Sequence, residues 1–207
     1  VVWPSHDGFD YPFQMDYEAA WRGTVSALAE IADRLAGMRV AIEYKPTDPR
    51  RFSLLANAGM SLLAIEEAGR ANLGITVDFA HSLMAGENPA TVVRVAAAKN
   101  RLMGLHLNDA YGRADDGLVV GSIHPLQTIE LLWHLQSAGY GGHIYFDTFP
   151  RLEDPVREAE LNIRQLRRFW DIARGIDSGR VASAFATQDP LVALSLVGEG
   201  ARAGALS

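Results

Sequence analysis

The chain has 207 residues, of which 48% are hydrophobic, a formal net charge of -6 and no cysteine. This length and composition predict one folded domain, and the acidic balance argues against a nucleic-acid partner, whose phosphates need clustered Lys and Arg. Without cysteine, neither a disulfide framework nor a thiolate metal site can form. No stretch reaches the ~18 consecutive apolar residues of a membrane-spanning helix, so we expect a cytoplasmic protein with no membrane partner.

Strand and helix patterns alternate along the chain. Residues 1–4 (VVWP) have the pattern of a strand end. Helices are expected over about 16–36, 52–68, 89–100, 125–138 and 154–174. Strands are expected at MRVAIEYKP (38–46), ITVDF (75–79), RLMGLHLND (101–109) and HIYFDTFP (143–150). Strict alternation predicts an α/β fold of parallel strands with right-handed crossovers.

Each of the four full strands carries one polar residue beside apolar neighbours that would face the helices. The four residues are Glu43, Asp78, His106 and Asp147. An unpaired carboxylate in a buried strand is costly, so a compensating charge is expected. A doubly wound sheet has helices on both faces and offers these groups no place, whereas a (β/α)₈ barrel gathers them at the C-terminal ends of its strands. Three carboxylates and one imidazole suit Mn²⁺, Mg²⁺ or Co²⁺ better than a structural zinc.

Three further polar features would lie beside this cluster. Lys45 shares a strand face with Glu43, where it can donate to a substrate oxygen or form an ion pair with that glutamate. His81 and the acidic pair Asp115 and Asp116 could hold a second ion, because a single bridging carboxylate spans the ~3.5–4 Å of a two-ion site. An acidic pair in a Gly-rich loop is usually a solvated turn, which is the alternative for Asp115 and Asp116.

Together, these motifs resemble the xylose isomerase-like barrel superfamily and, within it, the L-rhamnose isomerase group. IEYKP is similar to the Glu-x-Lys-Pro motif of these enzymes and DFAHSLMAGENP to their acid-x-x-His segment. HLND, ADDGLVVGSIHP and YFDTFP are similar to the seventh-strand motif, the second-metal loop and the last-strand acid. The resemblance spans about residues 1–170 and implies a metal-dependent aldose–ketose isomerase, using a hydride shift or an enediol.

The resemblance also implies a role for each matching residue. One ion, which grips two substrate hydroxyls, would be held by Glu43, Asp78, His106 and Asp147. A second, catalytic ion would be held by His81 and Asp115, with Asp78 shared between the two. Lys45 would polarise the sugar carbonyl, while Trp3 and His106 would face the substrate. Many relatives space the two loop acids one residue apart; Gly117 stands at that second position, so Asp116 either substitutes or has no role.

The resemblance further implies two divalent cations, Mn²⁺ foremost, a free sugar as the small-molecule partner, and a dimer or tetramer. It aligns VVWP with the end of the fourth barrel strand. We therefore expect residues 1–175 to be the C-terminal part of the barrel, strands 4 to 8, and residues 176–207 to form a helical tail. An incomplete barrel of this kind is expected to be inactive by itself.

Three alternatives remain open. A ketose 3-epimerase of the same superfamily uses one ion and two glutamates, but Asp147 is shorter than its last-strand glutamate, and Lys45 and the Asp115 loop have no role there. A deoxyribose-backbone endonuclease shares the barrel, but the acidic charge and the lack of extra histidine ligands disfavour it. A non-catalytic sugar-binding or oligomer-forming remnant is the alternative outside enzyme chemistry.

Overall fold

Four parallel strands form the centre of the molecule. The computed structural model describes residues 1–4 and 6–204, and its sheet has the order β1–β2–β3–β4. The strands are β1 (Val40–Glu43), β2 (Leu73–Asp78), β3 (Leu102–Leu107) and β4 (Ile144–Phe146). Val2 adds a single parallel bridge to Ile42, so the expected strand end at residues 1–4 lies alongside β1. The predicted parallel α/β arrangement is confirmed, as part of a barrel.

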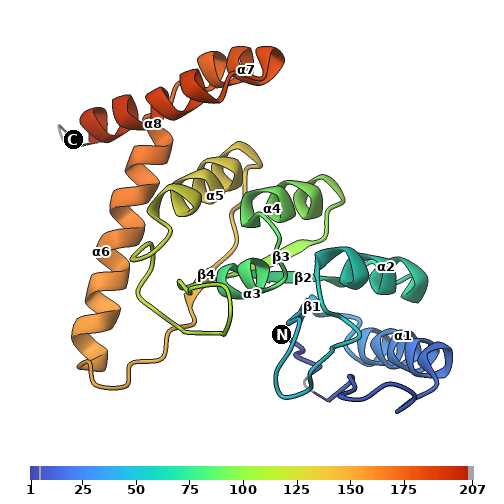
Figure 1. The fold of residues 1–207 in the computed structure, drawn as a ribbon. Helices are drawn as coiled ribbons and strands as arrows, with labels where there is room; N and C mark the ends of the chain where they lie inside the picture. Colours follow the sequence, from blue (N-terminus) through green and yellow to red (C-terminus); the bar gives the residue numbers. More distant parts are fainter. Residues whose placement is uncertain (5, 205–207) are drawn as a thin grey trace.

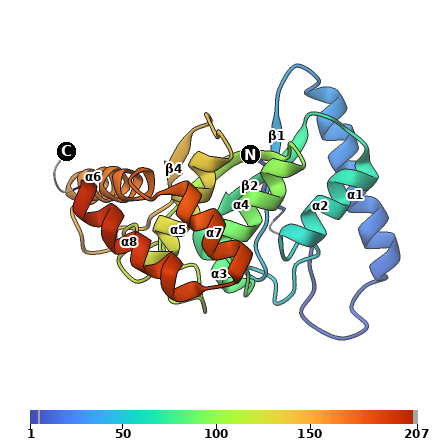
Figure 2. The ribbon, with the colours of Figure 1, turned by 90° about the horizontal axis from the view of Figure 1, so that it is seen from above.

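Most of the helices lie around one face of this sheet, and the last two lie outside that layer (Figures 1 and 2). The helices are α1 (Tyr17–Arg34), α2 (Ala58–Ala68), α3 (Phe79–Met84), α4 (Pro89–Ala98), α5 (Pro125–Ser137), α6 (Pro155–Arg174), α7 (Ser178–Thr187) and α8 (Pro190–Gly204). Neighbouring helices contact each other in the pairs α1–α2, α4–α5 and α5–α6, and α8 packs across the end of α6. Side chains such as Ile42, Val77 and Leu105 are fully buried in the core between sheet and helices. None of the helices in the described ranges is both long and apolar enough to cross a membrane.

Helix α2 begins later than the expected residue 52. Asn57 is its N-cap, and the Asn57 side chain accepts a hydrogen bond from the backbone N–H of Met60. Phe52 instead pairs with Phe9 through an antiparallel backbone bridge, and their rings stack 5.2 Å apart. The loop from 46 to 57 is therefore fastened to the N-terminal loop rather than wound into the helix.

Helix α3, which directly follows β2, is absent from the helices expected from the sequence. Asp78 caps it, because Asp78 Oδ1 accepts from the backbone N–H of His81 at 2.9 Å. The cap places His81 one helical turn beyond the strand-end acid. Strand β4 is also shorter than the expected 143–150, since only Ile144–Phe146 pairs with β3.

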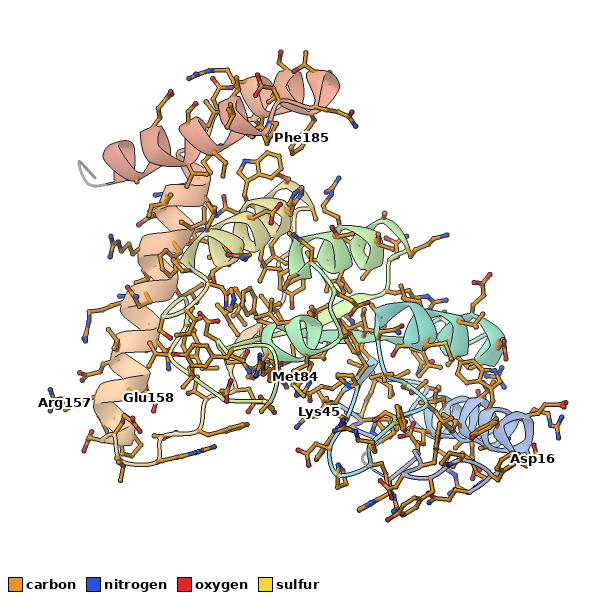
Figure 3. The ribbon with its side chains drawn as sticks, in the orientation of Figure 1. Asp16, Lys45, Met84, Arg157, Glu158 and Phe185 are labelled. Atoms are coloured by element: carbon orange, nitrogen blue, oxygen red, sulfur yellow. The ribbon has the colours of Figure 1, made fainter. Side chains whose placement is uncertain are left out.

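The C-terminal segment, in which only weak helical character is expected from the sequence, forms α7 and α8. Phe185 on α7 points towards α5 (Figure 3) and stacks on His134 with ring centroids 6.3 Å apart and an interplanar angle of 5°. The same ring meets Trp133 edge-on. These aromatic contacts join the tail to the barrel helices.

Candidate metal centre

Glu43, Asp78, His106 and Asp147 converge at the C-terminal ends of four adjacent strands. Glu43 and Asp78 end β1 and β2, His106 pairs in register with Asp78, and Asp147 follows β4. Each residue offers one potential ligand atom, and these atoms all lie within 4.8 Å of one another. His106 Nδ1 is 3.0 Å from Glu43 Oε1 and 3.6 Å from Asp147 Oδ2. The alternation of side chains along a strand explains the convergence, because Ile42, Val77 and Leu105 take the opposite, helix-covered face.

His81, Asp115 and Lys45 form a second group that touches the first. Asp115 Oδ2 lies 3.1 Å from His81 Nε2 and 3.0 Å from Lys45 Nζ. The other ring nitrogen, His81 Nδ1, is 3.7 Å from Glu43 Oε1 and 3.9 Å from Asp78 Oδ1. The residues expected to hold two ions therefore surround one continuous polar site.

Lys45 extends from the loop that follows β1 (Figure 3) and has two acidic partners. In the described part of the chain it pairs with Asp115 and with Asp48, whose Oδ2 is 3.1 Å from Lys45 Nζ, rather than with Glu43. Lys45 Nζ also lies 5.3 Å from the centre of the Trp3 ring, within range of a cation–π interaction. Trp3 thus lies beside the lysine, and Asp48 is a partner that the sequence does not reveal.

Burial and neighbouring charges shift the pKa values at the first cluster. Burial disfavours a charged carboxylate and raises the pKa of Asp78 to about 7, against the opposing effect of nearby His81. Burial also opposes a charge on His106, but its contacts with Asp147 and Glu43 outweigh this and raise the His106 pKa to about 10. Without a cation, the cluster therefore retains protons that a bound cation would displace.

The second group behaves as a set of mutually stabilised charges. Burial opposes ionisation of Asp115, yet His81 and Lys45 together hold the Asp115 pKa below its usual value. Burial likewise opposes the charges on His81 and Lys45, but Asp115 and the other nearby carboxylates raise both pKa values. Lys45 is consequently a cation throughout the neutral pH range.

The donor set fits a divalent cation. Within residues 1–4 and 6–204, His81 Nδ1 and Asp115 Oδ1 are buried without a hydrogen-bond partner, although buried polar atoms are normally paired. Imidazole nitrogen and carboxylate oxygen are both ordinary ligands of Mn²⁺ and related ions, as are the donors of the four-residue cluster. Unpaired ligand atoms beside a compact carboxylate–imidazole cluster indicate a place for positive charge.

Two acids near the site, Asp116 and Asp109, bind backbone N–H groups in the loop between β3 and α5. Asp116 Oδ2 accepts from the backbone N–H of Tyr111 at 2.8 Å, so Asp115 rather than Asp116 contacts His81. Asp109, which the sequence patterns do not single out, is fully buried and accepts from the backbone N–H groups of Ile123 and His124. Its Oδ1 also lies 2.8 Å from His124 Nδ1. The position of Asp109 at the end of the HLND motif is the signal by which the sequence could have indicated it.

Comparison with known proteins agrees with this geometry. The family model of the xylose isomerase-like TIM barrel matches residues 1–171. The chain belongs to this family. It is 33% identical over 161 residues to the xylose isomerase of Thermus thermophilus and 32% identical to that of Thermus caldophilus. Each alignment covers 74% of this chain and 42% of the relative, so the chain spans less than half the length of these curated relatives.

Solved structures extend the comparison to epimerases. A D-tagatose 3-epimerase-like protein superposes with a TM-score of 0.67 at 25% identity, covering 84% of this chain and 62% of that one. A xylose isomerase domain protein from Alicyclobacillus acidocaldarius gives 0.63 at 25% identity, covering 84% and 63%. An L-ribulose 3-epimerase, at 19% identity and a TM-score of 0.62, shares the fold. These relatives carry the names of both isomerases and 3-epimerases, so the common property is the barrel family rather than one reaction.

Proposed function

We propose that this protein is a metal-dependent aldose–ketose isomerase that acts on a free sugar such as L-rhamnose or a related aldose. The observation that carries the proposal is the second group of the site and its position beside the first. Lys45 and His81 meet Asp115 at 3.0 and 3.1 Å, beside the four-residue carboxylate–imidazole cluster. Membership of the xylose isomerase-like family supports sugar chemistry at this site.

Two divalent ions, Mn²⁺ foremost, are proposed. Glu43, Asp78, His106 and Asp147 would hold the first, and His81, Asp115 and the shared Asp78 the second. When bound, such ions supply positive charge to the oxygens of an open-chain sugar. The two unpaired atoms, His81 Nδ1 and Asp115 Oδ1, support a second position beside the cluster. A dimer or tetramer belongs to the same proposal.

Lys45 is proposed to act on the carbonyl end of the sugar. Its ammonium group is held by Asp115 and Asp48 and is a cation at neutral pH. It can therefore donate a hydrogen bond to the carbonyl oxygen, where negative charge develops whether the reaction is a hydride shift or passes through an enediol. Trp3, beside Lys45, would form part of the pocket wall.

Ketose 3-epimerisation is the second candidate, and the D-tagatose 3-epimerase-like structure favours it. That reaction uses two glutamates as acid and base around one ion. Here the cluster contains one glutamate, Glu43, and the shorter Asp147 stands after β4. Lys45 and the Asp115 loop have no role in that chemistry, so the contact between Lys45 and Asp115 favours the isomerase.

The deciding experiment is product analysis with the purified full-length protein, Mn²⁺ and two panels of sugars. Aldoses including L-rhamnose and D-xylose form the first panel, and ketoses including D-tagatose form the second. We expect aldose–ketose interconversion, lost with EDTA and strongly reduced in Lys45→Met. Conversion of ketoses into other ketoses, with no aldose consumed or formed, would establish the epimerase instead.

A further inference from the structure

The hydrogen bonds of Asn108 connect the C-terminal ends of β2, β3 and β4, next to the proposed metal ligands. Asn108 is fully buried in the loop directly after β3, two residues beyond His106. Its Nδ2 donates to Asp78 Oδ2 at 3.1 Å and to the backbone carbonyl of Asp147 at 3.0 Å. Its Oδ1 accepts from the backbone N–H of Ala80 at 3.0 Å. All three contacts fix parts of the chain that carry proposed ligands.

The contact with Ala80 fixes which way the amide faces. A backbone N–H can only donate, so the oxygen of the Asn108 amide must face Ala80. The NH₂ group is then directed towards Asp78 and Asp147, which both offer acceptors. Asn108 therefore presents donors to the site by chemical necessity.

Both oxygens of Asp78 are held as a result. The backbone N–H of His81 donates to Oδ1 at 2.9 Å, and Asn108 donates to Oδ2. Asp78 is the residue proposed to be shared by two ions, so the orientation of its carboxylate decides whether both positions can exist. Asn108 also holds the backbone at Asp147, whose N–H donates to the Leu107 carbonyl at 3.3 Å.

We infer that Asn108 is a positioning residue for the metal centre, which orients the Asp78 carboxylate and sets the backbone of Asp147 relative to His106. The inference rests on the proposed function, since it requires a cation at this site. Hydrogen-bond partners behind metal ligands typically change metal affinity by about 10–100-fold when they are removed. Asn108 acts through Asp78 and Asp147 rather than on the substrate.

The test measures Mn²⁺ binding to the 207-residue protein by the electron paramagnetic resonance signal of free Mn²⁺. Asn108→Leu has nearly the shape of asparagine and removes the donors. The matched control is Asn72→Leu. Asn72 likewise makes three side-chain hydrogen bonds, all to backbone carbonyls (Ala32, Leu35 and Met38), but it precedes the opposite end of β2. We expect Asn108→Leu to raise the Kd for Mn²⁺ by about 10–100-fold and to alter the spectrum of the bound ion. Asn72→Leu should lower Tm and leave Kd within about twofold of the unchanged protein.

Asn108→Ala provides a second variant that cannot clash with its surroundings, and it should also raise Kd. If folded Asn108→Leu or Asn108→Ala binds Mn²⁺ as tightly as the unchanged protein, Asn108 has no positioning role, while the proposed function stands. If the unchanged protein binds no Mn²⁺, the positioning role and the proposed function are both overturned. A parallel loss of affinity in Asn72→Leu would assign the effect to general stability and so also overturn the inference.

Discussion

His81 and Asp115 meet at 3.1 Å although they are 34 residues apart in the sequence. The short helix α3 carries the first residue and the loop after β3 carries the second. The other two atoms of this pair, His81 Nδ1 and Asp115 Oδ1, are buried and have no hydrogen-bond partner among the described residues. The four-residue cluster by itself would hold one ion, whereas His81 and Asp115 are the residues proposed to hold a second. Substitutions at these residues therefore test how many ions bind.

Replacing His81 should remove one ion of two. We predict that His81→Gln binds one Mn²⁺ per chain with affinity close to the tighter site of the unchanged protein, since the four-residue cluster remains. Isothermal titration with Mn²⁺ measures the stoichiometry. His143→Gln, an exposed histidine outside the site, is the control. Two ions bound to His81→Gln would refute His81 as a ligand of the second ion.

Asp78 is expected to matter for metal binding far more than for folding. Asp78→Asn relieves the cost of a buried carboxylate whose pKa is raised to about 7, but its NH₂ group replaces an oxygen that accepts from the His81 N–H or from Asn108, so the metal-free variant should stay folded with a modestly lower Tm. Loss of a residue that only hydrogen-bonds to a metal ligand typically lowers metal affinity by about 10–100-fold. Asp78→Asn removes a proposed ligand itself, so its Mn²⁺ affinity should fall further, and activity should be lost. Thermal unfolding in EDTA and Mn²⁺ titration separate the two effects, with exposed Asp33→Asn as the control. An active Asp78→Asn enzyme would end the shared-ligand model.

Replacing Gly117 in the acidic loop is predicted to destabilise the protein. Its φ is +60°, and an added Cβ would lie 2.3 Å from the Phe149 ring. We expect Gly117→Ala to lower the free energy of unfolding by at least about 1–2 kcal/mol, the usual cost of a left-handed conformation for a residue with a side chain. Gly141→Ala, where a Cβ would meet nothing within 4 Å, should be close to neutral. Denaturant unfolding of both variants decides the matter, and equal stabilities would contradict the structure of this loop.

The packing of α7 on α5 should weaken in acid. Burial lowers the pKa of His134, while nearby Glu130 raises it and Arg94 lowers it. Because the folded-state pKa lies below the unfolded one, the stabilisation is complete above about pH 6.5 and is lost as the pH falls through the folded-state value. We predict a fall in Tm between about pH 7.5 and about pH 5 that is smaller in His134→Gln. Equal pH dependence of Tm in both proteins would exclude His134 as a cause.

The sequence alone determined the alternating parallel fold and the four strand-end residues of the cluster. Side chains alternate with a period of two, so the apolar neighbours of Glu43, Asp78 and His106 are enough to assign these three residues to the face opposite the buried core. The same alternation placed Lys45 beside Glu43, but it could not name the partners of Lys45. Asp115 and Asp48 come from two different loops, and their distance from the lysine is set by how those loops fold.

Only the tertiary structure decided the surroundings of the cluster. The Asp78 side chain caps α3, and the backbone N–H of Ala80 in the first turn of α3 donates to Asn108 Oδ1 in the loop after β3. Asn108 reaches Asp78 over 30 positions and the Asp147 backbone over 39, so no local pattern distinguishes it from a polar turn residue. The chain order fixes which residues lie at strand ends, whereas the register between strands and the conformation of the loops fix which of those residues touch.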